Sequence, residues 1–420
     1  VMNHFVYQEG ALHVEDVPIA EIARTVGTPF YVYSHATLER HFTVFDRAFA
    51  RIPHMTCYSC KANTNIALLR LMARLGSGAD IVSAGELRAA LRASIPAERI
   101  VFSGVGKTEE EIAFAARSGI AMINMESAGE VRLAAAVGKK MGKKIPVSVR
   151  VNPEIDAKTH PYITTGLKKN KFGVLWEEAR GLYEEIRRAE HLLPVGISSH
   201  IGSQIVEIKP FVEAIRSLKR MVADLAESGI ALKYIDVGGG LGITYKDELP
   251  PHPEEYARAL EGELKGTGLT LVLEPGRVIV GNAGAFVTKL LYVKETPVKT
   301  FYVVDGAMND LVRPAFYGAY HEILPSTQEK AKKIRVDVVG PICESGDFLA
   351  RARRLPAMEP GALLVVMGAG AYGFSMSSNY NSRTRVPEVL VKGKEFFVIR
   401  QRETPQDLLR GESIPGFLEV

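Results

Sequence analysis

Short apolar or β-branched runs alternate with longer segments through the first two thirds of the chain. In the longer segments, apolar residues recur every three or four positions, which is typical of amphipathic helices; 109–117 and 208–227 are examples. Each short run but the last is followed by such a segment. The short runs are 54–59, 79–82, 100–102, 121–124, 146–151, 194–200, 233–237 and 270–274. Eight strands in this rhythm predict an α/β fold, a parallel (β/α)8 TIM-like barrel, with a doubly wound open sheet as the alternative.

The rhythm changes after about residue 283, where strand patterns follow one another without helices of crossover length between them. These strands are 285–291, 300–304, 335–340, 362–367 and 388–391. This pattern predicts a C-terminal antiparallel β domain, which a further strand at 30–33 is able to join. We therefore expect an N-terminal segment at 1–36 that joins the β domain, a barrel at 37–283 and the β domain at 284–420.

Composition excludes several classes of protein. The chain has 420 residues, a net charge of +4, 46% hydrophobic residues and 3 cysteines, which argues against disorder, a disulfide scaffold and a nucleic-acid-binding face. The longest uncharged stretch, 361–382, is too polar to span a membrane, and the N-terminus has no targeting pattern, so we expect a cytoplasmic protein. Cys57 and Cys60 have the spacing of a redox pair or half a zinc site, but no second pair accompanies them. We favour two buried structural thiols and expect no metal.

Unusual residues follow the expected barrel strands. Lys61 comes after the first strand, Asp80 lies in the second, His200 ends the sixth, and 238–242 (GGGLG) and 274–277 (EPGR) follow the seventh and eighth. Because a barrel carries its chemistry at the carboxyl ends of its strands, these residues predict an active site at one rim.

The chemistry of this rim suggests a cofactor. Four glycines in five positions let backbone N–H groups approach an anion, and the run matches neither a P-loop nor a dinucleotide fingerprint. A lysine enclosed at a strand end loses its proton more easily, and the neutral amine can form a Schiff base; without these neighbours Lys61 would be interpreted as a surface charge. A phosphate cradle, a reactive lysine and Glu274 as partner of a pyridine nitrogen together indicate pyridoxal 5'-phosphate.

Five motifs resemble those of the diaminopimelate decarboxylase family, within the alanine-racemase-like group of pyridoxal-phosphate enzymes. They are 58–63 (YSCKAN), 199–204 (SHIGSQ), 238–242 (GGGLG), 274–277 (EPGR) and 343–347 (CESGD). The resemblance runs in order from about residue 28 to the C-terminus. It implies an N-terminal barrel, a C-terminal β domain and a homodimer whose active sites are shared across the interface.

The resemblance also implies roles for individual residues. Lys61 would bind the cofactor covalently, His200 would stack on its ring, Glu274 would pair with its nitrogen, and Cys343 would protonate the carbanion left when CO2 departs. The remaining cofactor-binding residues would contact the phosphate; they are Ser203, Gly238, Gly239, Gly240, Gly276, Arg277 and Tyr372.

The substrate that the resemblance implies carries an amino-acid group at both ends, so its distal end presents a carboxylate and an ammonium. Arg277, Arg313 and Tyr317 can bind the carboxylate, and Glu344 can accept from the ammonium, with Tyr372 nearby. By itself, Arg313 would be interpreted as a surface arginine. The expected reaction is decarboxylation of meso-2,6-diaminopimelate to L-lysine and CO2, the last step of lysine biosynthesis. The alternatives are an ornithine, arginine or carboxynorspermidine decarboxylase of the same fold, an amino-acid racemase, a non-catalytic relative and a cofactor-carrying homeostasis protein.

Overall fold

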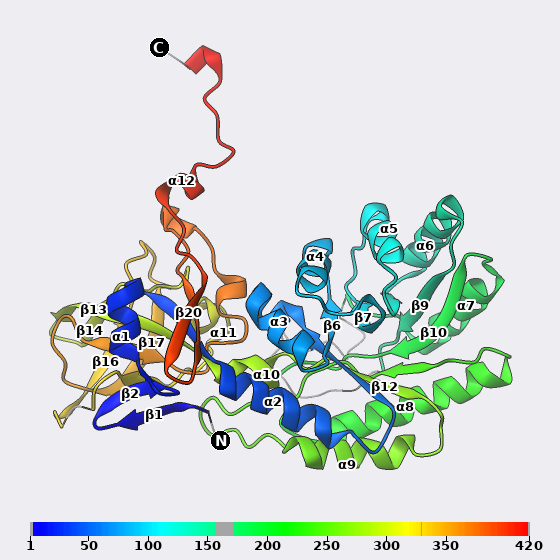
Figure 1. The fold of residues 1–420 in the computed structure, drawn as a ribbon, viewed down its shortest axis with the longest axis horizontal. Coiled ribbons are helices and arrows are strands. Elements are labelled where there is room, and N and C mark those ends of the chain that lie inside the picture. The colour runs from blue at the N-terminus through cyan, green and yellow to red at the C-terminus, as the bar shows by residue number, and fades with distance from the viewer. Residues whose placement is uncertain (1–2, 154, 156–170, 329, 419–420) are drawn as a thin grey trace. The chain divides into compact units, whose positions relative to one another are not determined.

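The computed structural model describes residues 3–153, 155, 171–328 and 330–418 (Figure 1). The chain divides into two compact units, one of residues 39–281 and the other of residues 1–38 together with 282–420. No helix in the described ranges is long and apolar enough to cross a membrane.

The unit at 39–281 contains a closed barrel of eight parallel strands, which confirms the predicted (β/α)8 fold and excludes the open sheet. Around the barrel the strand order is β10-β11-β12-β5-β6-β7-β8-β9. The strands are β5 (His54–Ser59), β6 (Gly78–Ile81), β7 (Ile100–Phe102), β8 (Met122–Met125), β9 (Ile145–Arg150), β10 (Leu192–Ser198), β11 (Tyr234–Asp236) and β12 (Thr270–Leu273).

Helices follow the strands in the expected alternation and lie outside the barrel (Figure 1). They are α3 (Ile66–Arg74), α4 (Ala84–Arg92), α5 (Glu109–Ser118), α6 (Ala128–Met141), α7 (Trp176–Arg188), α8 (Lys209–Glu227), α9 (Pro253–Leu264) and the short α10 (Arg277–Val280). The sequence specifies their ends locally: Thr108 and Glu111 form a reciprocal capping box at the start of α5, and Gly119 ends it in the left-handed conformation.

The barrel interior is apolar in one layer and polar near the carboxyl ends of the strands. Met55, Cys57, Val101, Met122 and Val272, from β5, β7, β8 and β12, form a buried cluster. Towards the carboxyl ends of the strands the buried residues become polar, which is where a barrel places its chemistry. Cys57 and Cys60 are both buried and unbridged, and burial raises the pKa of each thiol, so the prediction that both are buried is confirmed.

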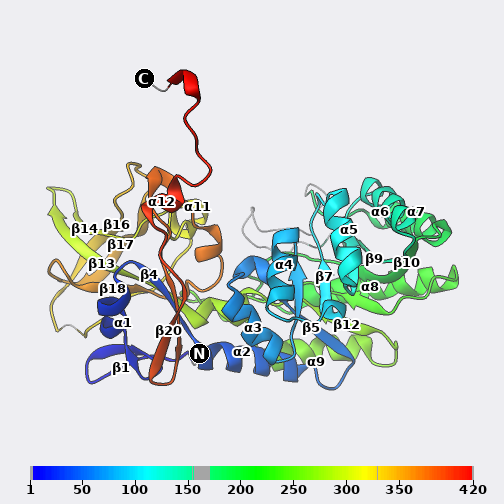
Figure 2. The same cartoon turned by 45° about the horizontal axis from the view of Figure 1, so that its top comes forward.

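The second unit contains a large sheet with the path β17-β16-β14-β13-β4-β19-β20, with β18 pairing with β13 and β15 (Figure 2). Its strands are β4 (Phe30–Ser34), β13 (Gly284–Glu295), β14 (Thr300–Val304), β15 (Ile323–Pro325), β16 (Lys333–Val339), β17 (Phe348–Pro356), β18 (Leu363–Val366), β19 (Glu388–Lys392) and β20 (Glu395–Arg400). The N-terminal strand β4 does join this sheet, between β13 and β19. The sheet is mixed rather than purely antiparallel, because β14 pairs with β16, and β4 with β19, in parallel.

A small sheet that the hydrophobic pattern did not predict covers one face of the large one. It contains β1 (Phe5–Gln8), β2 (Ala11–Val14) and β3 (Val17–Pro18), followed by α1 (Ile19–Val26). Leu12, Val14 and Ile22 from this layer pack with Val32 and Val287 in one buried cluster. The remaining elements are α2 (His35–Ala48), α11 (Arg313–Tyr317), α12 (Pro405–Leu408) and the 3-10 turns Cys60–Ala62, Ala97–Arg99, Gly281–Ala283, Phe374–Met376, Tyr380–Ser382 and Gly416–Leu418.

Candidate active site

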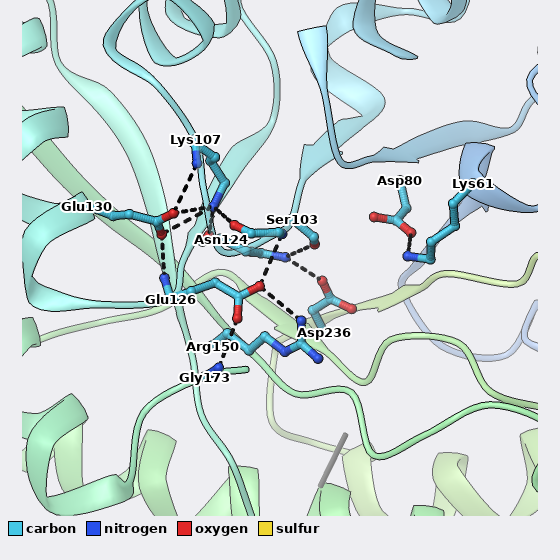
Figure 3. Close-up of polar contacts among 11 residues, drawn as sticks. Lys61, Asp80, Ser103, Lys107, Asn124, Glu126, Glu130, Arg150, Gly173 and Asp236 are labelled. Atoms are coloured by element: carbon cyan, nitrogen blue, oxygen red, sulfur yellow. Dashed lines mark hydrogen bonds and ion pairs between the residues drawn. The ribbon is translucent and has the colours of Figure 1, made fainter. Parts of the chain in front are cut away.

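Lys61 lies at the carboxyl end of β5, in the 3-10 turn Cys60–Ala62. Its Nζ donates to Asp80 Oδ2 over 2.6 Å (Figure 3). Ser59 Oγ donates to the same oxygen over 2.6 Å. Asp80 is fully buried, whereas the Lys61 side chain keeps 34% of its surface exposed. The carboxylate therefore holds an accessible amine in one place at the barrel mouth, as a covalent attachment point requires.

The glycine run after β11 is packed too closely for side chains. A Cβ on Gly239 would lie 2.2 Å from the carbonyl oxygen of Glu274, and one on Gly240 would lie 2.5 Å from that of Gly202. Gly240 also has φ of +112°, where glycine is favoured. The Gly238 N–H donates to Asp236 Oδ1 over 2.9 Å, so in this structure it is engaged within the chain. The run brings bare backbone from β11 against the loop after β12.

His200 follows β10 and lies beside the same glycines, since a Cβ on Gly238 would be 2.6 Å from His200 Nδ1. Burial, together with the positive charges of Arg150 and Lys61, lowers the pKa of His200 well below its ordinary value. The imidazole is therefore neutral at neutral pH, which suits a flat ring that stacks on an aromatic ligand.

Glu274 follows β12 and is only 5% exposed. Burial raises the pKa of its carboxyl well above the ordinary range, and the neighbouring charges of Asp236 and Asp80 raise it further. Among the described residues, Glu274 Oε1 is buried without a hydrogen-bond partner. Such an oxygen is costly unless a ligand supplies its partner, so this position points to a bound group.

Asp236, the last residue of β11, was not selected from the sequence. Its Oδ2 accepts from Asn124 Nδ2 over 3.3 Å, and burial raises the pKa of its carboxyl to about 6. Asp80, Asn124, Arg150 and Asp236 each occupy the last or next-to-last position of a barrel strand. A polar residue at the end of an otherwise apolar strand was the sequence signal that identifies all four.

A second buried network lies across β8 and β9 (Figure 3). Glu126 accepts from Arg150 Nη1 over 2.9 Å and from the Gly173 N–H over 2.8 Å. Lys107 Nζ lies 3.3 Å from Glu130 Oε2 and donates to the Asn124 carbonyl over 2.7 Å. The paired charges fix the rim loops and place the positive charge of Arg150 near His200.

Arg277 and Ser203 come together in the same unit. Arg277 begins α10 and is 7% exposed; its Nη2 donates to Ser203 Oγ over 3.0 Å and its Nη1 to Tyr245 Oη over 2.7 Å. Tyr245 was not selected from the sequence because its loop carries no periodic signal. The contacts hold a buried guanidinium in place beside the loop that follows the glycine run.

The remaining candidates lie in the other unit. Arg313 is buried, so its interpretation as a surface arginine is wrong. Its Nη1 donates to His321 Nε2 over 2.9 Å, and His321 Nδ1 in turn donates to the Met367 carbonyl over the same distance. Tyr317 ends the same helix, α11, and is partly exposed.

Cys343 and Glu344 are exposed neighbours on a loop between β16 and β17, and Tyr372 lies in a later loop in the left-handed conformation, with φ of +56°. The Cys343 N–H donates to Asn381 Oδ1 over 3.0 Å, and Glu344 Oε2 accepts from Tyr380 Oη over 2.9 Å. The convergence of Arg313, Glu344 and Tyr372 on one ligand with the barrel residues stays a prediction.

The barrel residues fit pyridoxal phosphate. The unpartnered Glu274 oxygen matches a ring nitrogen that carries a proton, and the side-chain-free backbone at Gly239 and Gly240 matches a phosphate. Lys61, held by Asp80, matches the aldehyde. The ring nitrogen, the phosphate and the aldehyde of one ligand thus each have a matching group in this structure. The matching groups lie at the ends of three strands, β5, β11 and β12.

Glu86, in the first turn of α4, provides a test of the electrostatics of this rim. Burial and the charge of Asp80 raise the pKa of Glu86 to about 7, from an ordinary value of 4.5. The folded protein therefore holds a proton that the unfolded chain has lost, and stability falls as pH rises from about 4.5 to about 7. Glu86→Gln should remove this loss, so at pH 8 the variant should exceed the unmodified protein by about 3 kcal/mol in free energy of unfolding.

Urea unfolding at pH 4.5 and pH 8, without added cofactor, measures the difference. The exposed Glu98→Gln is the control and should show no pH-dependent gain. An equal effect of Glu86→Gln at both pH values would contradict the assignment.

Comparison with known proteins gives a family. Residues 35–281 match the model of the pyridoxal-dependent decarboxylase pyridoxal-binding domain. The chain is 49% identical over 415 residues to a diaminopimelate decarboxylase of Haemophilus influenzae, with 98% of this chain and 100% of that protein covered. It is 48% identical over 413 residues to one of Pseudomonas aeruginosa, covering 98% and 99%.

A crystal structure of diaminopimelate decarboxylase from M. jannaschii in complex with L-lysine superposes with a TM-score of 0.95 at 38% identity. The match covers 99% of this chain and all of that one. Together with the barrel and the residues at its rim, these likenesses establish that the chain belongs to the diaminopimelate decarboxylase family of pyridoxal-dependent decarboxylases.

Proposed function

We propose that this enzyme decarboxylates meso-2,6-diaminopimelate to L-lysine and CO2, the last step of lysine biosynthesis. The observation that carries the proposal is identity of 48 to 49% along 98% of the chain to diaminopimelate decarboxylases. The electrostatics of the barrel rim support it, because they match a pyridoxal phosphate ligand at three separate points.

Pyridoxal phosphate, when bound, supplies an electron sink for the pair released as the bond to the carboxylate breaks. Lys61 would hold the cofactor covalently and release it to the substrate amine, while Glu274 would keep the ring nitrogen protonated. His200, neutral in its site, would stack on the ring. The residues that would bind the phosphate are Ser203, Gly239, Gly240, Gly276, Arg277 and Tyr372. Gly238, whose N–H donates to Asp236, would shape the backbone of this cradle.

The distal end of the substrate needs both signs of charge. Arg277 and Arg313 would bind its carboxylate with Tyr317 and Tyr372, and Glu344 would bind its ammonium. Arg313 is buried and bonded to His321, which supports this role because the bond holds its planar guanidinium in one orientation. Ornithine has no distal carboxylate, so an ornithine decarboxylase would leave two arginines in the pocket without a partner from the substrate. This disfavours the ornithine alternative.

Cys343 would deliver a proton to the carbon that loses CO2. Its side chain is exposed in this unit, so it is accessible to a ligand. A single proton donor on one side of the substrate gives decarboxylation with one stereochemical outcome, whereas racemisation needs a second base.

Release of labelled CO2 from meso-diaminopimelate, ornithine, arginine and carboxynorspermidine tests the substrate. We expect kcat/KM for CO2 release to be at least about 100-fold higher with diaminopimelate than with the other three substrates. The reason is that the site has a partner for each of the two charged groups at its distal end. Preferential release from ornithine would reverse the assignment.

We further propose a cytoplasmic homodimer in which the loop bearing Cys343 and Glu344 completes the active site of the other copy. We propose domains at 37–283 and 284–420, with the segment 1–36 joining the second. Specific activity should then fall as the protein is diluted below the dimer dissociation constant, measured beside sedimentation at each concentration. Constant specific activity across dissociation would contradict the shared site.

A further inference from the structure

In the unit that contains the large sheet, two loops are joined by two hydrogen bonds. Two adjacent residues of one loop bind two adjacent residues of the other. Tyr380 Oη donates to Glu344 Oε2 over 2.9 Å, and the Cys343 N–H donates to Asn381 Oδ1 over 3.0 Å. The neighbours Tyr380 and Asn381 thus hold the neighbours Glu344 and Cys343 at two points. Tyr380 and Asn381 belong to none of the motifs on which the resemblance rests.

The loop that carries Tyr380 and Asn381 is itself held at several points. Asn379 Nδ2 donates to Glu403 Oε2 over 2.7 Å, and the Ser378 N–H donates to the Asn309 carbonyl over 2.9 Å. Asn381 has φ of +56° and ψ of +30°, a left-handed conformation that asparagine tolerates better than most residues. The turn Tyr380–Ser382 is therefore a built support rather than a free loop.

The loop that carries Cys343 and Glu344 is anchored on both sides of the pair. Asp347 accepts from the N–H groups of Ile342 and Met308, each over 2.7 Å. Between these anchors the two side chains are exposed. An exposed glutamate ordinarily populates several rotamers, so a donor that binds one of its oxygens reduces the entropy lost when a ligand binds the other.

We propose that Tyr380 is a specificity-determining positioning residue that orients Glu344 for the distal ammonium of the substrate, and that Asn381 positions Cys343 for proton delivery. This inference rests on the proposed function. The Glu344 carboxylate also raises the pKa of the Tyr380 phenol, which keeps the hydroxyl protonated as a donor.

Tyr380→Phe removes the hydroxyl and keeps the ring. Two competitive inhibitors separate the ammonium from the rest of the ligand: L-lysine, and 6-aminohexanoate, which is lysine without its α-amine. We expect inhibition by lysine to weaken about tenfold and the KM of diaminopimelate to rise about tenfold, since a hydrogen bond to a charged group is lost. Inhibition by 6-aminohexanoate and kcat should change less than about twofold, because neither depends on the ammonium contact.

Tyr292→Phe, at a tyrosine that is 67% exposed on β13, is the matched control and should leave both inhibitors unchanged. In a Glu344→Gln background, Tyr380→Phe should have no further effect, because Tyr380 acts through Glu344. A parallel change for both inhibitors indicates a merely structural role and overturns the inference, as does the absence of any change.

Asn381 is tested by a pair of variants. Asn381→Gly accepts the same backbone conformation without an acceptor and should lower kcat about tenfold with KM nearly constant; Asn381→Asp keeps an acceptor oxygen and should restore most of kcat. Equal kcat in Asn381→Gly and the unmodified enzyme overturns this part. If the unmodified enzyme releases no CO2 from diaminopimelate, the proposed function fails and the inference with it. If it does release CO2 and the two inhibitors respond alike in Tyr380→Phe, only the inference fails.

Discussion

Lys61→Ala should abolish turnover of meso-diaminopimelate, with a loss in kcat of the order of 10⁴-fold or more, as for other residues that form a covalent link in catalysis. The variant should also lose the visible absorbance of covalently held cofactor. The physical reason is the geometry of the rim. Asp80 holds the Lys61 amine over 2.6 Å, and Glu274 and the glycine run follow the neighbouring strands β12 and β11. CO2 release and an absorbance spectrum after removal of free cofactor measure the two effects.

The melting temperature of Lys61→Ala separates loss of the attachment point from loss of fold, because the variant leaves the fully buried Asp80 without its paired amine. Lys140→Ala is the matched control: Lys140 also pairs with a carboxylate, Glu109 over 2.8 Å, but on the exposed surface between α5 and α6. It should retain full activity. Retained turnover in Lys61→Ala, with a normal melting temperature, would refute the assignment of the site.

The barrel was predictable because each of its strands forms from a local pattern. Parallel strands covered by helices are buried on both faces, so they appear as short continuous apolar runs between amphipathic segments. The expected run 54–59 coincides with β5, and 146–151 differs from β9 by one residue at each end. Alternation alone left a doubly wound sheet as the alternative, and the closed barrel, in which each strand lies beside its successor, decides between them.

The sheet of the other unit was only partly predictable, because its pairings join distant segments. The parallel pairs β4–β19 and β14–β16 are set by the packing of the whole sheet, so no local pattern indicates strand direction. Strand β17 (FLARARRLP) contains three arginines, so it lacks the apolar signature of a strand. Strand β20 (EFFVIR) has an apolar sequence, although most of its residues are exposed in the fold, and it was missed. The small sheet β1–β3 consists of strands of two to four residues, too short for periodicity to reveal.

The site was predictable where chemistry restricts the residue type and not where it depends on neighbours. Lys61, Glu274 and the glycine run stand out by type and by position at strand ends. Asp236, at the end of an apolar strand, also stands out by type and position, but its importance depends on contacts from Asn124 and Gly238 that only folding creates. The burial of Arg313 also depends on a contact that only folding creates. Its partner His321 follows a turn that interrupts the hydrophobic pattern.

Gly239→Ala should weaken binding of pyridoxal phosphate by about 100-fold, because overpacking against rigid backbone costs about 1–3 kcal/mol and each 1.4 kcal/mol is a factor of ten. A Cβ at this position would lie 2.2 Å from the Glu274 carbonyl oxygen, so the loops after β11 and β12 must separate, and they carry the phosphate cradle and the partner of the ring nitrogen.

The affinity change is measured by titrating the apoenzyme with pyridoxal phosphate and following absorbance. Gly106→Ala is the matched control on the same unit, in the loop after β7, where an added Cβ has nothing within 4 Å; its affinity should be unchanged. The overlap can lower both the stability of the apoenzyme and its affinity for pyridoxal phosphate, and the melting temperature of the Gly239→Ala apoenzyme separates these effects. A small decrease in melting temperature with a large loss of affinity indicates that the substitution acts mainly on the phosphate cradle. Ordinary affinity in Gly239→Ala would mean that this backbone does not bind the phosphate, and the cradle would have to be sought elsewhere on the rim.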